Sequence, residues 1–295
     1  MGPLLGRQEE SPGRRPLEEP LAVGGWPGRP TRGVRDISSH PHRPGVGEFD
    51  RAAASYDRSR RPPSEGELKA VVNALEGCRS VLDVGTGTGR YALPLERHGF
   101  TVKGMDLSRP MLHVARAKGL YELLQADAFR LPLREGSMDG SVAVHVLQLV
   151  SDPVAVLREM GRVTRRRVVG VLPPDPEQRK CRTPGPFEQA MARYMEMAKE
   201  RGYAMPFTQQ HEENRQKVLE GCPPPVVTHV DDQEGVFPDD MTWNDARDFM
   251  GLFDVPPEVH SEFVGLLGPL PAPRADGFRR IIEVARWDSP ALLPR

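Results

Sequence analysis

Residues 81–90 read VLDVGTGTGR and combine an acid, Asp83, with three alternating glycines, Gly85, Gly87 and Gly89. Four residues typical of a buried strand lead directly into the turn that contains these glycines. Glycine adopts positive φ without strain, and its missing Cβ lets a ligand approach the backbone closely. A helix after such a turn directs free N–H groups and a partial positive charge at an anionic group. The stretch therefore predicts a site for a nucleotide-like ligand.

A second acid, Asp106, follows the next strand-like run at 101–105. Its carboxylate could accept hydrogen bonds from both hydroxyls of a ribose, each worth ~1.5–3 kcal/mol because the carboxylate is charged. The glycines follow the pattern G-x-G-x-G, whereas the dinucleotide fingerprint is G-x-G-x-x-G. Asp106 alone fits NAD and S-adenosylmethionine equally well, so other motifs must separate the two ligands.

Further motifs surround these acids in a characteristic order. They are FDRAAASYD at 49–57, DVGTGTG at 83–89, LSRPML at 107–112, LQADA at 124–128 and SMDGSV at 137–142. Together they resemble class I S-adenosylmethionine-dependent methyltransferases, most closely the small-molecule branch that includes the ubiquinone/menaquinone methyltransferases. The likeness covers about 49–174. It implies an α/β fold: a Rossmann-like, doubly wound, mostly parallel seven-stranded sheet with a helical lid insertion before the last strand.

The resemblance also implies S-adenosyl-L-methionine as the cofactor and assigns residues to it. The glycine loop would line the methionine moiety, with Asp83 near its amino group, and Asp106 would hold the ribose. Leu107 and Met111 would flank the adenine, whose edge would meet the residues at 127–128. Tyr56 either lies near the sulfonium or simply packs an N-terminal helix. The full set of implied cofactor-binding residues is Asp83, Gly85, Thr86, Gly87, Gly89, Asp106, Leu107, Met111, Asp127, Ala128, Val146 and Tyr56.

His145 follows the fourth predicted strand and, with Val146 and Leu147, would face the transferred methyl group. Methyl transfer is an in-line displacement, and orientation alone can supply roughly 7–11 kcal/mol of the barrier. A dedicated catalytic residue is therefore optional. If the acceptor is a hydroxyl, His145 is the candidate general base; the alternative is a histidine packed at the end of a strand.

Regular alternation of strand and helix signals favours a parallel sheet covered by helices on both faces. The predicted strands lie near 80–85, 101–106, 121–126, 139–147, 166–172 and 278–287, and helices are expected at 49–57, 62–77, 187–201, 241–252 and 257–267. Ligands of such sheets bind outside the carboxyl ends of the strands, where the residues singled out above fall. Pro94 predicts a late start or a kink in the helix after the glycine loop.

The chain divides into four predicted parts. Residues 1–45 are rich in Gly, Pro and Arg, lack any period and are expected to be disordered. Residues 46–175 form the cofactor-binding core, 176–275 the lid and substrate region, and 276–295 the closing strand and tail.

Composition narrows the possible partners. The net charge is −1, with 40 Lys and Arg against 41 Asp and Glu, which argues against an obligate nucleic-acid binder. No apolar run is long enough for a membrane span, and no secretory signal or acid-poor transit peptide is expected. Three widely spaced cysteines without metal-ligand spacing indicate reduced thiols, a cytoplasmic location and no metal site. The oligomeric state stays open.

The leading hypothesis is a methyltransferase for a small-molecule acceptor, acting at O, C or N. A macromolecular (RNA or protein) methyltransferase is an alternative, although HVLQ at 145–148 replaces the N/D-P-P-Y/F signature of amino-group DNA methylation. A nucleotide-dependent oxidoreductase is disfavoured by the glycine spacing. A non-catalytic S-adenosylmethionine-binding regulatory protein remains open, because a fold does not determine function.

Overall fold

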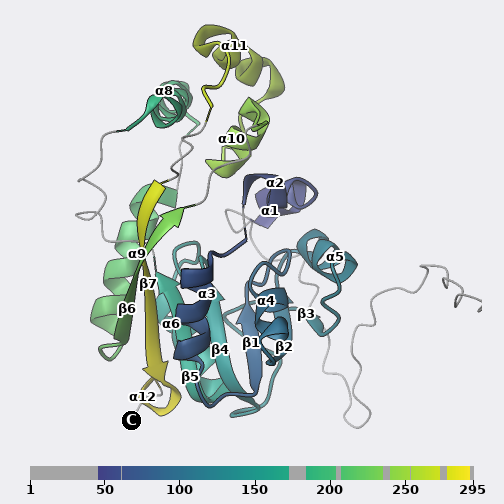
Figure 1. The fold of residues 1–295 in the computed structure, drawn as a ribbon, viewed down its shortest axis with the longest axis vertical. Helices are drawn as coiled ribbons and strands as arrows, with labels where there is room; N and C mark the ends of the chain where they lie inside the picture. The colour runs from purple at the N-terminus through teal and green to yellow at the C-terminus, as the bar shows by residue number, and fades with distance from the viewer. Residues whose placement is uncertain are drawn as a thin grey trace, which may run out of the picture. The chain divides into compact units, whose positions relative to one another are not determined.

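The computed structural model describes residues 46–60, 62–172, 184–203, 207–234, 240–252, 254–272 and 278–292. Its centre is a seven-stranded sheet with the order β3-β2-β1-β4-β5-β7-β6 (Figure 1). The strands are β1 Ser80–Val84, β2 Thr101–Asp106, β3 Leu123–Gln125, β4 Met138–Val144, β5 Thr164–Leu172, β6 Val226–Glu234 and β7 Phe278–Asp288. Only β7 runs antiparallel to its neighbours, β5 and β6. The predicted mostly parallel, doubly wound sheet is confirmed; the segment predicted to be disordered, 1–45, lies outside the described residues.

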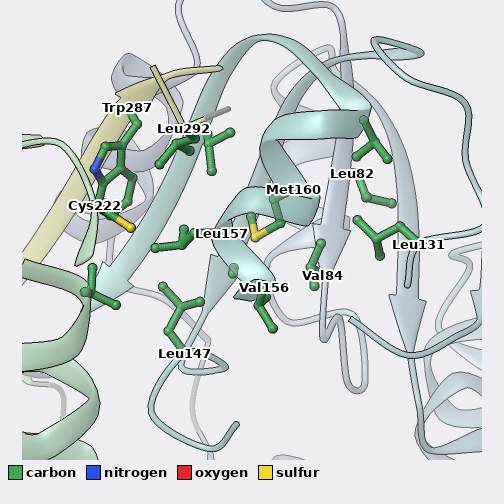
Figure 2. Packing of buried hydrophobic residues seen from close by; sticks show 14 of the residues in the cluster. Leu82, Val84, Leu131, Leu147, Val156, Leu157, Met160, Cys222, Trp287 and Leu292 are labelled. Atoms are coloured by element: carbon green, nitrogen blue, oxygen red, sulfur yellow. The ribbon is translucent and has the colours of Figure 1, made fainter. Parts of the chain in front are cut away.

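Helices cover both faces of this sheet. The helices are α1 Val46–Ala52, α2 Tyr56–Ser59, α3 Glu65–Ala74, α4 Ala92–Arg97, α5 Arg109–Ala117, α6 Pro153–Val163, α8 Pro186–Glu200, α9 Phe207–Gly221, α10 Trp243–Phe249, α11 Pro257–Leu267 and α12 Ser289–Leu292. Side chains of α3, α4 and α5 pack in one buried cluster, whereas those of α6 and α12 and the end of α9 pack in the other. Figure 2 shows the second cluster, in which Leu157 and Met160 of α6 lie with strand side chains and Trp287.

Strand alternation explains why an acid can lie in the core strand β1. Successive side chains of a strand point to opposite faces. The side chains of Leu82 and Val84 belong to the buried cluster that contains α6, which we call the α6 cluster, and Val81 belongs to the cluster that contains α3 and α4. Asp83 therefore shares the face of Val81 and points toward α4, at the carboxyl end of the strand. The sequence periodicity thus places one charged group at the edge where ligands of this fold bind.

Local signals account for most helix boundaries. Ser64 caps α3 by accepting a hydrogen bond from Glu67 N, and the Thr242 side chain forms a capping box with Asp245. Pro94 lies in the first turn of α4, which begins only at Ala92, so the predicted late start is confirmed. The helix expected over 49–57 is instead two short helices, α1 and α2, separated by a turn.

Three helices between β5 and β7 share a hydrophobic core of their own. Phe187 and Tyr194 of α8 pack with Trp243 of α10 and Phe263 of α11. The Tyr194 ring stacks on Trp243 with centroids 5.4 Å apart, and its hydroxyl lies 2.6 Å from His260 Nδ1. We call α8, α10 and α11 the insertion cluster. They lie beyond the carboxyl ends of the parallel strands (Figure 1). In the described ranges, no helix has the length and apolarity needed to cross a membrane.

Helix α9 was not predicted, because its inward residues recur only every fourth position and the first of them is polar. These residues are Asn214, Val218 and, just past the helix, Cys222. Asn214 is 1% exposed, and its Nδ2 donates to the carbonyls of Leu147 at 3.0 Å and Val150 at 2.7 Å. The helix thereby fastens the loop that follows β4.

We expect Asn214→Ala to lower the free energy of unfolding by about 2–3 kcal/mol, since two buried carbonyls lose their donor. Urea denaturation would measure the change. Gln216→Ala is the matched control, because Gln216 is an exposed amide of the same helix that pairs only with Glu220 in the described structure. Equal stability of the two variants would show that Asn214 does not hold the loop.

Candidate active site

The glycine loop turns from β1 toward α4 through three glycines with positive φ: 70° at Gly85, 53° at Gly87 and 81° at Gly89. A Cβ added at Gly85 would lie 2.3 Å from Val146 Cγ2, so the loop packs directly against the residue after His145. A Cβ added at Gly87 would meet nothing within 4 Å. The tip of the loop is therefore open, whereas its base is closed by β4.

Asp106 holds this tip from the neighbouring strand. Its Oδ2 accepts a hydrogen bond from Gly87 N at 2.8 Å, and its Oδ1 accepts one from Ser108 N at 2.8 Å. Burial raises the pKa of Asp106, although the backbone hydrogen bonds oppose the shift. A carboxylate offers about four acceptor positions. Asp106 therefore retains acceptor capacity for further donors beside the loop.

Asp83 lies beneath the loop and is 2% exposed. Thr86 Oγ1 donates to its Oδ2 at 2.7 Å. Burial, together with the nearby charge of Asp106, raises the pKa of Asp83 to about 7, although the hydrogen bond from Thr86 opposes the shift. A buried acid of this kind gains from any cation placed near it, because the cation restores the attraction that the lost water supplied.

His145 directly follows β4 with φ 57°, and it is the one non-glycine residue with positive φ among those described. Backbone strain of this kind is kept where the surrounding structure enforces it, often at functional sites. Gln148 Nε2 lies 3.3 Å from His145 Nδ1, and Gln148 itself is 7% exposed. Its Oε1 is buried without a hydrogen-bond partner within the described ranges. Sequence reasoning missed Gln148, because a lone glutamine carries no motif.

The remaining predicted residues differ in how much surface they offer. Leu107 and Asp127 are half-buried, and Ala126 N donates to Asp106 O at 3.1 Å, which brings the ends of β2 and β3 together. Asp127 Oδ1 accepts from Phe129 N at 3.0 Å, and Ala128 packs against the α6 cluster. Met111 is 2% exposed, so its side chain presents almost no surface to a ligand.

Residues 46–60, which we call the strap, contribute contacts that the motifs did not reveal. Asp57 Oδ1 accepts from Thr88 Oγ1 of the glycine loop at 2.6 Å. Asp50 Oδ1 accepts from Ser108 Oγ at 2.5 Å, beside Asp106. Tyr56 lies at the start of α2, with the guanidinium of Arg60 5.6 Å from its ring centroid. The strap thus lies over both loops of the predicted cofactor site.

Arg60 and Arg90 approach the same region from the strap and from the end of the glycine loop. Burial lowers the pKa of the Arg60 guanidinium; Tyr56 opposes this shift, and the charge of Arg90 adds to it. Two cations in the same region attract an anionic group. A positional signal existed in the sequence, since Arg90 directly follows the last glycine of the loop, but charge alone does not distinguish it from a solvated arginine.

Comparisons with known proteins match this core. Residues 82–171 match the family model described as "Methyltransferase domain". A phosphatidylethanolamine N-methyltransferase from Cereibacter sphaeroides is 41% identical over 123 residues, covering 38% of this chain and 59% of the relative. A demethylmenaquinone methyltransferase from Thermus thermophilus is 36% identical over 145 residues, covering 44% and 66%.

A malonyl-[acyl-carrier protein] O-methyltransferase from Serratia marcescens is 34% identical over 119 residues, covering 40% of this chain and 47% of the relative. The chain thus spans about half to two thirds of the length of these relatives. A crystal structure from Thermotoga maritima, described as a possible histamine N-methyltransferase, aligns with a TM-score of 0.47 at 21% identity, covering 82% of this chain and 99% of the other.

The matched residues run from β1 to β5 and include the glycine loop, Asp106 and His145, whereas the insertion cluster, α9, β6 and β7 lie beyond them. The order of motifs in the sequence and the strand order of the sheet agree with this match. The resemblance to class I methyltransferases is thereby confirmed for the core, and residues 82–171 form a methyltransferase domain.

Proposed function

We propose that this protein transfers the methyl group of S-adenosylmethionine to a small-molecule acceptor by in-line displacement. The arrangement of Asp106 carries the proposal. Its carboxylate lies against the open tip of a glycine loop, holds Gly87 N and Ser108 N, and keeps acceptor capacity for a ribose diol. The family match at 82–171 supports the same ligand.

The residues present fit this cofactor. A Cβ at Gly87 would enter open space, so the loop has room for a ligand against its backbone. We assign the ribose to Asp106, the α-ammonium to Asp83 and the adenine to Leu107, Asp127 and Ala128. The methionine moiety would lie along 85–87, with Gly89 completing the turn.

Two further assignments rest on charge and on packing. We assign the carboxylate of the cofactor to Arg60 and Arg90, whose like charges are close enough to lower the pKa of Arg60. Tyr56 would close this side, since its ring lies under Arg60. Met111 would support α5 from within, because its side chain is buried.

The cofactor supplies an activated methyl group. The protein has to bind and orient the two reactants and to exclude water from them. Val146 packs against Gly85, and this packing would hold the segment after β4 beside the reacting atoms. His145 as general base requires an unprotonated Nε2. If Gln148 Nε2 donates to His145 Nδ1, the ring proton is on Nε2 and His145 is a donor. Rotating the amide by 180° reverses the roles and makes His145 a base.

We assign the acceptor only to the class of small molecules. By their names, the relatives described above act on phosphatidylethanolamine, on malonyl-[acyl-carrier protein] and on demethylmenaquinone, at nitrogen in the first and at oxygen in the second, so they do not favour one acceptor atom. Acceptor choice would lie in the insertion cluster and α9, which are outside the family match. The free thiols of Cys78 and Cys222 support the proposed cytoplasmic location.

Cofactor binding should strengthen with rising pH. The folded-state pKa of Asp83 is raised to about 7, so the acid is mostly protonated below that pH and mostly charged above it. The charged form attracts the α-ammonium of the ligand. We expect the Kd for S-adenosylhomocysteine to fall by about tenfold between pH 6 and pH 8 and then to level off. Without ligand, ionisation of Asp83 opposes folding, so the same pH rise lowers stability.

Calorimetry at the two pH values measures this dependence, and Asp83→Asn is its control. The amide cannot ionise, so the variant should bind with the same affinity at pH 6 and pH 8. An unchanged pH dependence in Asp83→Asn would assign the titration to another group.

Titration of the purified protein with S-adenosylmethionine, S-adenosylhomocysteine and NAD tests the cofactor. Micromolar binding of both sulfur ligands and no binding of NAD is the expected result. Turnover with a panel of quinols, phenols, amines and small carboxylates then tests the acceptor class. Binding without turnover on any small molecule, or turnover on RNA or protein, would contradict the proposed reaction.

A further inference from the structure

The strap has two sets of contacts that involve different residues. In the first set, acids of the strap contact the glycine loop and the segment after β2 that contains Ser108, which together we call the cofactor loops. Asp57 accepts from Thr88 Oγ1 at 2.6 Å and from Lys118 Nζ, at the end of α5, at 2.7 Å. Asp50 accepts from Ser108 Oγ at 2.5 Å. Thr88 and Ser108 are almost fully buried. Thr88 directly follows Gly87, and the backbone N–H of Ser108 donates to Asp106, so these bonds fix the residues beside the glycine loop and beside Asp106.

The second set binds the insertion cluster and the turn after α10 through two arginines and a serine. Arg58 Nε donates to Asp245 Oδ1 at 3.1 Å, and Ser55 Oγ donates to Asp248 Oδ2 at 3.2 Å, both on α10. Arg51 Nη2 donates to Asp254 Oδ1 at 2.6 Å. The guanidinium of Arg58 also lies 3.8 Å from the Asp240 carboxylate.

We propose that Asp50 and Asp57 are positioning residues for the cofactor loops, and that the strap transmits cofactor occupancy to the insertion cluster. The inference rests on the proposed function, because it needs a ligand at Asp106 and the glycine loop. A ligand there fixes the loops that hold Asp50 and Asp57. The same short segment presents Arg51, Ser55 and Arg58 to the acids at 240–254, so ordering one attachment favours the other.

Such coupling is reciprocal: what stabilises the strap on the insertion cluster also tightens cofactor binding.

Hydrogen–deuterium exchange of the full chain tests the transmission, with S-adenosylhomocysteine as the probe. In the wild-type protein, saturating ligand should slow amide exchange in α10 by about tenfold or more. The double charge reversal Arg51→Glu/Arg58→Glu places like charges against Asp254, Asp245 and Asp240. This variant should keep the exchange rate of α10 within about twofold of its ligand-free rate when ligand is added.

Arg193→Glu/Arg201→Glu is the matched control. It makes the same change in net charge at two arginines that are equally exposed but pair with Glu196 and Glu262 inside the insertion cluster. The control should retain the ligand-induced slowing. Full slowing in Arg51→Glu/Arg58→Glu, or its loss in both double variants, would overturn transmission through the strap.

The positioning role has a separate measurement. Asp57→Asn, which keeps the shape but loses the charge, should weaken S-adenosylhomocysteine binding about three- to tenfold. The expected loss is smaller than that for a residue that touches the ligand. Unchanged affinity would refute the role of Asp57. Calorimetry also separates the two proposals: no binding to the wild-type protein would contradict the function, whereas binding without any change in α10 would contradict only the inference.

Discussion

Asp106→Ala should weaken S-adenosylhomocysteine binding by about a hundredfold. The variant removes the acceptor for the ribose and, at the same time, the acceptor for Gly87 N and Ser108 N. The tip of the glycine loop then loses its hydrogen bond to the residue at the end of β2. Calorimetric titration measures the change, and circular dichroism checks that the variant is folded.

Asp139→Ala is the matched control for this experiment. Asp139 is also a strand carboxylate that accepts from backbone amides, those of Arg79 and Ser80, but it lies at the start of β4, away from the site. Those bonds lower the pKa of Asp139 from 3.8 to about 2, so its charge stabilises the folded protein fully above pH 3.8, and this stabilisation is lost as the pH falls toward 2. Its loss should lower stability and leave ligand affinity unchanged. Equal affinities of the two variants would show that Asp106 does not contribute to ligand binding.

Gly85→Ala should lower the free energy of unfolding by about 2–5 kcal/mol and abolish measurable ligand binding. Two costs add: ~1–2 kcal/mol for a side chain at positive φ, and ~1–3 kcal/mol for overpacking, because the new Cβ would lie 2.3 Å from Val146 Cγ2. Relief of the overpacking would displace Val146 and the end of β4. Urea denaturation and calorimetry measure the two effects.

Two companion variants separate the costs. Gly119→Ala also places a side chain at positive φ, 103°, but its Cβ would meet nothing within 4 Å, so it reports the conformational cost alone. Gly85→Ala/Val146→Ala removes the clash but not the strain and should recover part of the lost stability. If Gly85→Ala is no less stable than Gly119→Ala, the close packing of the loop on β4 is refuted.

The sequence was sufficient to predict the core because each of its elements carries its own signal. Alternation at Leu82 and Val84, the glycines of the loop and the proline at 94 are local features, and the structure places the resulting elements where expected. The acids Asp83 and Asp106 were found because both end strands. Their positions follow from topology, since parallel strands that alternate with helices end at one edge of the sheet.

Other features depend on contacts between distant residues, which no local pattern encodes. The turn between α1 and α2 coincides with bonds from Ser55 to α10 and from Asp57 to Thr88, so tertiary contacts override an otherwise continuous helical pattern. The burial of Asn214 cannot be predicted from its residue type, because its two carbonyl partners are distant in the sequence. Gln148 pairs with His145, whose backbone adopts positive φ, and the residue types of this segment indicate neither feature.

The placement of β7 between β5 and β6 has a consequence for how the chain folds during synthesis. Strand β5 emerges early, but the partner for its outer edge is β7, which is made only after the whole insertion cluster. Until then the edge of β5 presents unpaired backbone groups, and β6 has no described neighbour in the sheet. A nascent chain therefore exposes this unpaired edge while the residues between β5 and β7 are synthesised, and the sheet is completed only when β7 pairs with β5 and β6.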